Sequence, residues 1–346
     1  MKYQIDESFL IDCFKEIVET PSPVGYYVKL NPVLERYAAM FHQTVTYDNK
    51  STAYITLDGQ DNSKTVLIGA HADTIGLVVR TIDKNGMIRV RQLGGVNYGS
   101  LEGETVTIHT RDGREYTGLF ACQSHSVHVF DDARTLERNE NTMMIILDEK
   151  VSSKEDVKAL GIRHGDFVSV DPRFQFTKNG YLKSRFIDDK AAVACCFTML
   201  KYLKENNLKP KYRTILAFPY SEEIGFGGTY VPSEVSEYVA IDIGLIGPDY
   251  EGNEYAVSIC AKDNAAPYDY ELTTRLIEYA EKAGCDHVVD IFYRYGTDGN
   301  AAVRAGNNLR AAAFGMAVYC SHGMERTHIE GLKNTMNLLL AYVLDL

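Results

Sequence analysis

The feature that most restricts the fold is a change of hydrophobic pattern in the middle of the chain. Up to about residue 75 and again after about residue 170, helical and strand periods alternate. Between these limits the chain shows only short alternating strands, separated by turn signals such as Asn85-Gly86 and Asp112-Gly113. We therefore predict an α/β fold in which residues 1–74 and 171–346 form one discontinuous domain, with residues 75–170 as an inserted small β-barrel domain.

The same spacing of apolar residues predicts individual helices and strands. The helical spacing of Leu10, Phe14 and Ile17 stops at Thr20-Pro21-Ser22-Pro23, and a second helical stretch precedes Phe41. The run 65–70 is apolar at almost every position, which predicts a strand in a sheet covered on both faces. Further strands are predicted at 44–47, 52–57, 87–90, 105–109, 116–120, 143–147, 213–219, 239–244 and 311–318, and further helices at 188–206, 272–283 and 329–344.

Length and charge exclude several classes of protein. A chain of 346 residues with 45% hydrophobic and 24% charged residues can bury the core of one large or two moderate globular domains. Its 36 basic against 47 acidic residues give a net charge of -11, which repels phosphate backbones and anionic lipids. We therefore expect neither nucleic acid nor a membrane as a partner.

Cysteines and the first residues indicate the compartment. The 7 cysteines are scattered and never spaced as Cys-x-x-Cys, which is typical of free thiols in a reducing compartment. Asp6 and Glu7 lie where a signal peptide needs an apolar core, and the longest near-apolar run, Ala191 to Leu200, is about half a bilayer span. We expect a cytoplasmic protein.

Polar side chains able to bind metal occur in five short segments at the ends of apolar elements. Ligands of open α/β sheets bind beyond the carboxyl ends of the strands, and four of these segments lie at or near such ends. The segments are His71-Ala72-Asp73, Asp188-Asp189-Lys190, Ser221-Glu222-Glu223, Asp242 and Ser321-His322-Gly323.

Each segment alone has an ordinary structural explanation. An aspartate at a helix start, such as Asp188, usually caps the helix, and a histidine after a strand is usually a polar residue leaving the core. Adjacent glutamates are usually solvated, but Glu222 and Glu223 are flanked by apolar residues and glycines. Asp242 lies between Val-Ala-Ile and Ile-Gly in a predicted strand, so its carboxylate must be paired, hydrogen-bonded or metal-bound.

Taken together, the segments predict metal-assisted hydrolysis. Two histidines, two aspartates and one glutamate suit divalent zinc, cobalt or manganese. A carboxylate bridging two ions about 3.5 to 4 Å apart, with an unbound glutamate nearby as base, is the usual equipment for hydrolysing an amide. Glu222 and Glu223 can divide the roles of base and ligand.

The chain resembles a family of dinuclear metallopeptidases that includes glutamyl, deblocking and tetrahedral aminopeptidases. The resemblance covers nearly the whole chain and depends on the order and spacing of nine motifs. They are Pro21-Ser-Pro-Val-Gly25, Gly69-Ala-His-Ala-Asp-Thr-Ile-Gly76, Leu93-Gly-Gly95, Leu160-Gly-Ile-Arg-His-Gly-Asp166, Ser184-Arg-Phe-Ile-Asp-Asp-Lys190, Ser221-Glu-Glu-Ile-Gly225, Ala240-Ile-Asp242, Gly296-Thr-Asp298 and Tyr319-Cys-Ser-His322.

The resemblance implies two divalent ions per chain, zinc or cobalt in the first place and manganese as a further option. It implies that Asp188 bridges them. His71 and Asp242 would complete one site, and Glu223 and His322 the other.

The resemblance also implies the reaction and the assembly. Glu222 would be the general base toward a water activated by both ions, and Asp73 would support the ligands from behind. The fold would be a mixed sheet flanked by helices, of the zinc-peptidase type. The enzyme would remove N-terminal residues from short peptides. The inserted β-barrel would act as a dimerisation and lid domain, giving homo-oligomers from dimers up to dodecamers.

Several positions depart from the family pattern. Thr74 stands where many members have Glu, Lys190 where Arg is usual, and Gly323-Met324 where Ser-Pro follows the histidine. Val318 precedes Tyr319, so the arginine often found shortly before that histidine is missing. None of these changes removes a ligand, but they leave the preferred N-terminal residue open.

Two further motifs have structural interpretations. His125 and His128 resemble a metal pair but have no carboxylate aligned with them, so we expect a structural role or a loop that approaches the site. Gly225-Phe-Gly-Gly228 lacks the spacing of a dinucleotide fingerprint, so we expect it to allow close packing.

Three rival functions remain in view. A related dipeptidase or deacylase would use the same metals and differ in its dependence on a free amine. An endoglucanase would need carboxylates on both sides of a sugar bond, which the adjacent Glu222 and Glu223 cannot provide. A non-enzymatic metal-binding or scaffold protein would not need a base beside its ligands.

Overall fold

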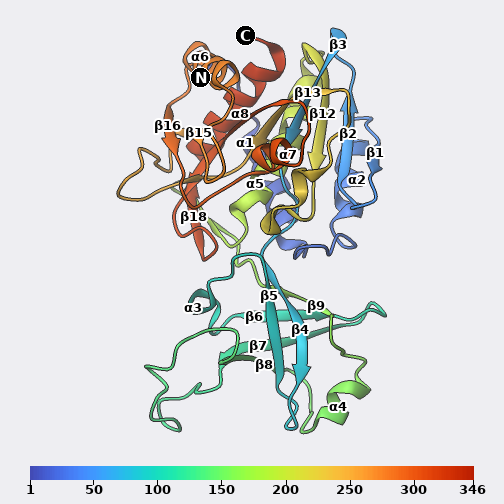
Figure 1. The fold of residues 1–346 in the computed structure, drawn as a ribbon, viewed down its shortest axis with the longest axis vertical. Helices are drawn as coiled ribbons and strands as arrows, with labels where there is room; N and C mark the ends of the chain where they lie inside the picture. The colour runs from blue at the N-terminus through green and yellow to red at the C-terminus, as the bar shows by residue number, and fades with distance from the viewer. The chain divides into compact units, whose positions relative to one another are not determined.

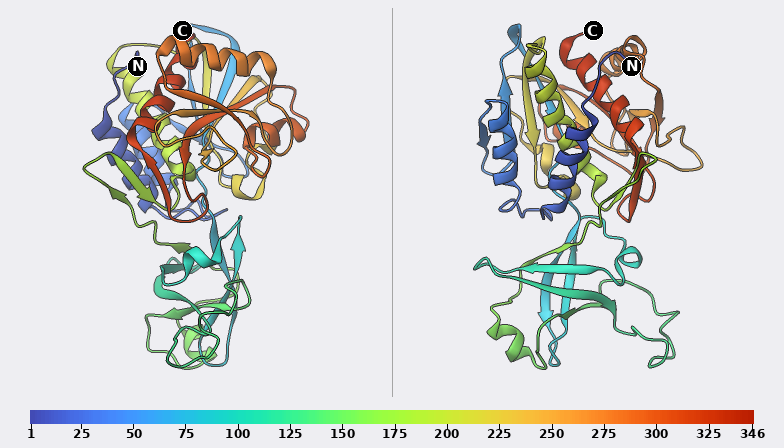
Figure 2. Two further views of the ribbon diagram at one scale, coloured as in Figure 1. Left: turned by 90° about the vertical axis from the view of Figure 1, so that its left-hand side faces the viewer. Right: turned by 180° about the vertical axis from the view of Figure 1, so that it is seen from behind.

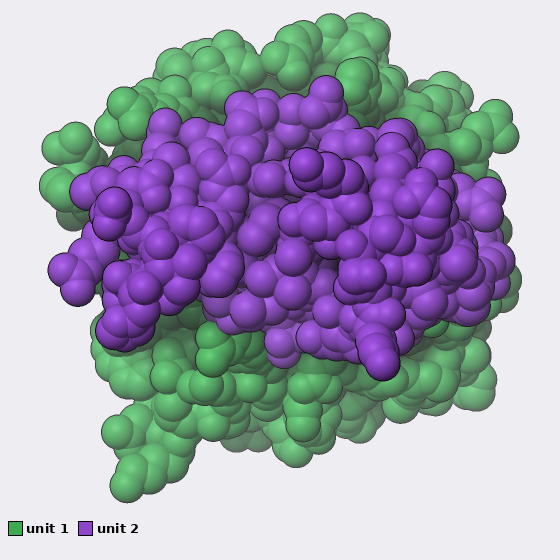
Figure 3. Space-filling model, turned by 90° about the horizontal axis from the view of Figure 1, so that it is seen from below, with its two compact units in different colours: residues 1–73, 173–346 green, residues 74–172 purple.

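The computed structural model describes residues 1–346 and divides into two compact units. Unit 1 comprises Met1–Asp73 and Arg173–Leu346, and unit 2 comprises Thr74–Pro172 (Figure 3). Unit 1 has a mixed sheet flanked by helices, and unit 2 is a closed β-barrel, so the predicted fold class is confirmed.

The main sheet of unit 1 has nine strands in the order β1-β2-β12-β3-β13-β17-β15-β16, with β14 beside β17. The four central strands β12, β3, β13 and β17 run parallel, so their carboxyl ends meet at one edge. The bounds are β1 Val45–Tyr47, β2 Ala53–Leu57, β3 Asp61–Gly69, β12 Tyr212–Phe218, β13 Val235–Ile241, β14 Gly244–Leu245, β15 Val257–Lys262, β16 His287–Ile291 and β17 Arg310–Val318.

Helices cover both faces of this sheet. Figures 1 and 2 show α1, α5 and α8 on one face and the short α7 on the other. Helix α5 is buried on almost every side because α1 and α8 pack against it, and α6 packs against α8. The bounds are α1 Glu7–Glu19, α2 Asn31–Met40, α5 Ile187–Glu205, α6 Tyr270–Ala283, α7 Asp298–Arg304 and α8 Ile329–Leu344.

A small antiparallel sheet brings together two segments that are distant in the sequence. It consists of β10 Gln175–Phe176, β11 Tyr181–Ser184 and β18 Glu325–His328. Strand β11 leads into α5, whereas β18 follows the turn after β17. The sequence analysis missed β18 because Glu-Arg-Thr-His has no apolar alternation, and it becomes a strand only by pairing with β11.

Unit 2 is a closed barrel of six strands in the order β4-β5-β8-β7-β6-β9, with every neighbouring pair antiparallel. Gly86 and Gly113 occupy positive-φ positions at φ 82° and 85°, in the two turns predicted from Asn-Gly and Asp-Gly. The bounds are β4 Gly76–Ile82, β5 Ile88–Leu93, β6 Thr105–His109, β7 Glu115–Cys122, β8 Met143–Leu147 and β9 Phe167–Val170, with short helices α3 Tyr98–Leu101 and α4 Lys154–Ala159.

All cysteines are free thiols, and Cys320 alone is exposed. No helix has the length and apolar composition needed to cross a bilayer.

Candidate metal centre

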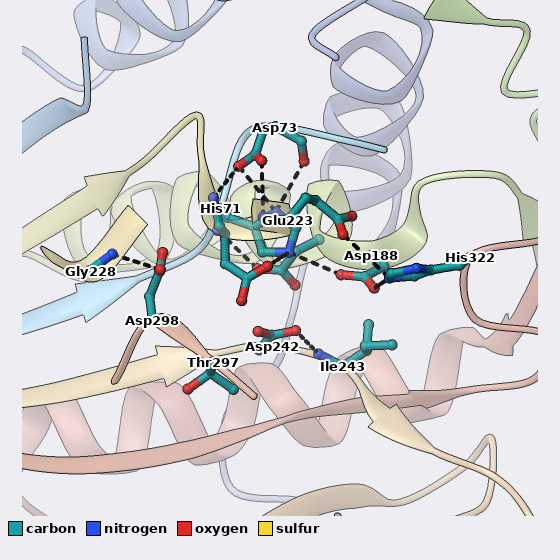
Figure 4. A network of polar contacts seen from close by, with 12 residues as sticks. His71, Asp73, Asp188, Glu223, Gly228, Asp242, Ile243, Thr297, Asp298 and His322 are labelled. Atoms are coloured by element: carbon teal, nitrogen blue, oxygen red, sulfur yellow. Dashed lines mark hydrogen bonds and ion pairs between the residues drawn. The ribbon is translucent and has the colours of Figure 1, made fainter. Parts of the chain in front are cut away.

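The predicted ligands come together at the carboxyl edge of the parallel strands in unit 1. His71 follows β3, and Asp242 follows β13. Glu223 lies in a single 3-10 turn, η1 (Glu222–Ile224), after β12, and His322 lies in the turn after β17. Asp188 reaches the same place from the start of α5 (Figure 4).

The prediction that Asp242 lies inside a strand from 239 to 244 is wrong. Strand β13 ends at Ile241, and Gly244–Leu245 forms the separate strand β14. The Asp242 amide still donates to the Phe314 carbonyl of β17 at 3.0 Å, and Asp242 Oδ1 accepts the next amide, that of Ile243, at 2.7 Å. The carboxylate therefore lies just past the end of β13, and it is buried.

Asp188 faces two histidines. Its Oδ1 lies 3.0 Å from His71 Nε2, and its Oδ2 lies 3.6 Å from His322 Nε2. His322 Nε2 also lies 3.3 Å from Glu223 Oε2. The side chain of Asp188 makes no capping bond for α5, so the ordinary explanation for an aspartate at a helix start does not apply here.

Asp73 supports the site from behind. Its carboxylate accepts the backbone N–H of Glu222 at 3.1 Å and that of Glu223 at 3.2 Å. Its carbonyl oxygen lies 3.0 Å from His71 Nδ1, so a proton on Nδ1 leaves the Nε2 lone pair directed at Asp188. Asp73 is fully buried and thus fixes three of the groups at the site.

Two groups of side chains have ligand atoms close enough to hold a metal ion. One contains His71, Asp188 and Glu223, and the other contains His71, Asp189 and Asp242, with the atoms of each within 4.8 Å of one another. Asp188 and Asp242 do not share a group, and His322 belongs to neither, although it contacts Asp188 and Glu223.

Asp189 is a candidate ligand that the sequence analysis left without a role. Its Oδ2 accepts the His71 amide at 3.1 Å, and its buried Oδ1 has no hydrogen-bond partner. Its place beside Asp188, just before the apolar run that begins at Ala191, was the available signal. An orphaned carboxylate oxygen in such a cluster is explained by a cation.

Electrostatics favour a bound cation at this site. Burial, together with repulsion from Asp188, raises the pKa of Glu223 and of Asp242 to about 8. Burial also raises the pKa of Asp188, but hydrogen bonds from His322 and His71 outweigh this and hold it well below its usual range. Such carboxylates are costly to ionise together unless positive charge is supplied, and the histidine and carboxylate donors suit a divalent ion.

A cavity of about 510 Å³ opens at the candidate ligands. Asp188, Glu222, Glu223, Asp242 and His322 line it.

The residues that depart from the family pattern do not line this cavity in unit 1. Lys190 donates to the carbonyl of Ile17 at 3.1 Å and to that of Thr20, at the end of α1. Gly323 donates to the Cys320 carbonyl at 2.8 Å within the turn that carries His322. Burial lowers the pKa of Lys190 to about 7, and the nearby Asp73 carboxylate opposes this shift only in part.

The glycine motif after Glu223 packs closely, as predicted. A Cβ on Gly228 would lie 2.1 Å from the Asp298 carbonyl oxygen, and one on Gly227 would lie 2.2 Å from Asp298 Oδ2. Asp298 also accepts the Gly228 amide at 2.6 Å (Figure 4), a role that the sequence analysis did not assign. In unit 2, neither His125 nor His128 belongs to a group of candidate ligands.

The structure thus combines a mixed α/β sheet with candidate metal-binding groups beyond the carboxyl ends of its parallel strands. The chain belongs to the M42 glutamyl aminopeptidase family, whose pattern matches residues 51–338, and this confirms the resemblance found in the sequence.

Known relatives agree with this assignment. The chain is 38% identical over 334 residues to the protein named "Putative aminopeptidase YhfE" from Bacillus subtilis (strain 168), with 96% of each chain covered. A TET aminopeptidase from Thaumarchaeota archaeon SCGC AB-539-E09 has a similar fold, with a TM-score of 0.89, 17% identity and coverage of 98% of this chain and 97% of that chain. The TET1 peptidase of Pyrococcus horikoshii, which can assemble into a tetrahedron or a large octahedral shell, gives a TM-score of 0.84 at 23% identity, with 97% and 100% covered.

Proposed function

We propose that the protein is a metal-dependent aminopeptidase that binds two divalent ions per chain and removes N-terminal residues from short peptides. The observation that carries the proposal is the buried cluster in which Asp188 lies between His71 and His322. We also propose a cytoplasmic location, which the free cysteines support.

Five side chains would hold the ions. His71 and Asp242 would bind one ion, Glu223 and His322 the other, and Asp188 both. Zinc and cobalt suit this set best, and manganese is also compatible with it. When bound, two such ions polarise a peptide carbonyl and make water a stronger acid.

Glu222 is the proposed general base. Its side chain is 13% exposed, it lines the cavity, and its Oε2 lies 3.7 Å from His71 Nε2. Burial, opposed by His71 and reinforced by Asp242, raises its pKa well above the usual range, which suits a group that must take a proton from water. The two carboxylate oxygens of Asp73 accept the backbone N–H groups of Glu222 and Glu223 and so fix their positions. Asp73 is therefore a positioning residue.

A panel of chromogenic aminoacyl substrates, assayed with zinc, cobalt and manganese, tests this function. Cleavage should require a free α-amino group, and N-acetylated versions should be inert. Cleavage of acylated substrates alone would favour the deacylase, and cleavage restricted to dipeptides would favour the dipeptidase. Hydrolysis of β-glucans is not expected, because Glu222 and Glu223 are adjacent on one turn.

The cavity also favours a substrate class. Arg294 and Arg304 line it, and neither forms an ion pair with a carboxylate of the protein. Guanidinium groups left unpaired beside a binding site attract carboxylates. We propose that the enzyme prefers peptides with an N-terminal Glu or Asp.

Substitution of these arginines should reveal the preference. Arg294→Gln or Arg304→Gln should lower kcat/KM for the glutamyl substrate by about 10- to 100-fold, since a hydrogen bond to a charged group contributes roughly 1.5–3 kcal/mol. The leucyl substrate should be affected much less. Arg310→Gln removes an arginine that pairs with Glu271 outside the cavity, and it serves as the control. Equal losses on both substrates, or a wild type that prefers leucine, would contradict the acidic preference and leave the aminopeptidase intact.

Self-association through unit 2 is a further part of the proposal. The closed barrel exposes apolar side chains such as Leu119, Val127 and Val129, which are 43%, 53% and 68% exposed. Val127 and Val129 lie in the segment between β7 and β8, and exposed apolar side chains of this kind are candidates for contacts between subunits. Light scattering should report a dimer or a larger assembly. The double variant Val127→Asp/Val129→Asp should form an assembly of lower mass. A strictly monomeric wild type would contradict this proposal.

A further inference from the structure

Glu325 connects two of the proposed ligands through their backbones. It is the first residue of β18 and only 2% exposed. Its Oε2 accepts the amide N–H of Asp188 at 3.0 Å, and its Oε1 accepts the amide N–H of His322 at 3.1 Å. One carboxylate therefore joins the turn that carries His322 to the start of α5, and Asp188 lies 137 residues before Glu325 in the sequence.

Neither His322 nor Asp188 itself has the backbone conformation of a regular helix or strand. His322 has a φ of 60°, in the left-handed region that non-glycine residues seldom adopt, and Cys320 in the same turn has a φ of 58°. Asp188 lies before the regular part of α5, at φ -71° and ψ 102°. The left-handed conformation of His322 and Cys320 persists only where the surrounding contacts determine it, whereas that of Asp188 is extended.

The side chain of His322 is less buried than that of the other proposed histidine ligand. Its side chain is 33% exposed, whereas that of His71 is 2% exposed. The turn that carries His322 is flanked by an antiparallel bridge between Tyr319 and Arg326 and closed by the hydrogen bond from Gly323 to the Cys320 carbonyl. Within the turn, the Glu325 carboxylate accepts the amide N–H of His322.

The chemistry of a carboxylate suits this position. Two N–H donors converge on one side chain, and a carboxylate offers an acceptor oxygen to each. A glutamine of the same size offers one acceptor and an NH₂ group, which would face an N–H donor. The antiparallel pairing of Glu325 with Ser184, four residues before Asp188, places the carboxylate beside the start of α5.

We propose that Glu325 is a positioning residue that fixes the backbones of Asp188 and His322 relative to each other, so that the second metal site is in place before the ion binds. The inference rests on the proposed function in one respect, the roles of Asp188 and His322 as ligands. It predicts that loss of Glu325 weakens metal binding without removing a ligand.

Cobalt binding provides the first test. Metal-free Glu325→Gln should bind the more weakly held Co²⁺ about 10- to 100-fold less tightly than the wild type, with altered visible absorption bands, because groups that orient ligands have effects of this size. Activity should recover partly at high Co²⁺ concentration. The matched control is Glu254→Gln, which alters a glutamate that is also buried but pairs with Arg326 outside the site. Wild-type affinity and spectrum in Glu325→Gln, or an equal loss in Glu254→Gln, would overturn the proposal.

Amide hydrogen exchange provides a second test that needs no metal. In the metal-free wild type, the amides of Asp188 and His322 should exchange slowly, and at least one should exchange ten or more times faster in Glu325→Gln. Rapid exchange of both amides in the wild type, or unchanged exchange in the variant, would overturn the proposal. A wild type that binds no Co²⁺ would overturn the proposed function, and the exchange experiment would still decide whether Glu325 holds the two backbones.

Discussion

Glu222→Gln is expected to lower kcat by about 10² to 10⁴-fold or more, while the metal content stays near that of the wild type. Glutamine keeps the size of the side chain and its hydrogen-bonding oxygen, but it cannot accept a proton from water. The backbone bond from Glu222 to Asp73 is unaffected by the substitution, so the neighbouring ligand should stay in place. Steady-state kinetics and elemental analysis of the same preparation provide the measurement.

Glu223→Gln is the matched comparison, because it makes the same chemical change one residue further along the same turn. Here a neutral amide replaces an anionic ligand, so one ion should be lost or weakly held, and activity should recover partly at high metal concentration. If both variants stay active and fully metallated, the pair is an ordinary acidic pair. Reversed phenotypes would show that base and ligand have been assigned the wrong way round.

Removal of metal should abolish activity altogether. The proposed mechanism leaves no route to hydrolysis without the ions, since no other group at the site can polarise the peptide carbonyl as strongly. Dialysis against a chelator should reduce turnover to background, and zinc, cobalt or manganese should restore it.

The stoichiometry of reconstitution decides between one ion and two. Titration of the metal-free protein should reach saturation at two ions per chain, as expected if Asp188 binds both. Saturation at a single tight ion would contradict the dinuclear proposal. Full peptidase activity in excess chelator would contradict metal dependence itself.

The spacing of apolar residues along the sequence was sufficient to predict much of the fold. The helix expected at 329–344 and the strands expected at 105–109 and 143–147 have those bounds in the structure, because each is a continuous apolar or alternating run. Strands β11 and β18 could not be predicted, since their residues are mostly polar and their pairing depends on segments far away in the chain. Asp242 was placed inside a strand because its neighbours are apolar, and the bond from the Ile243 amide to its side chain is a local contact that the apolar pattern does not reveal.

Some residues of the candidate site could be predicted from the sequence, and others could not. Residue type and position after a strand were enough to select His71 and Glu223, and the structure brings them within reach of Asp188. Asp189 and Glu325 were not selected, because both act on backbone amides of residues that are distant in sequence. Contacts of this kind depend on side-chain direction, which no spacing along the chain specifies.

The order of the strands has a consequence for synthesis on the ribosome. Strand β3, which leads to His71, lies between β12 and β13, and both of these strands are made after residue 200. Unit 2 is continuous in sequence and is complete at Pro172, so it can fold while β3 still lacks both neighbours. The last proposed ligand, His322, emerges later still. A nascent or truncated chain therefore holds no assembled centre, and the cell meets this peptidase activity only after translation has passed the final turn of the site.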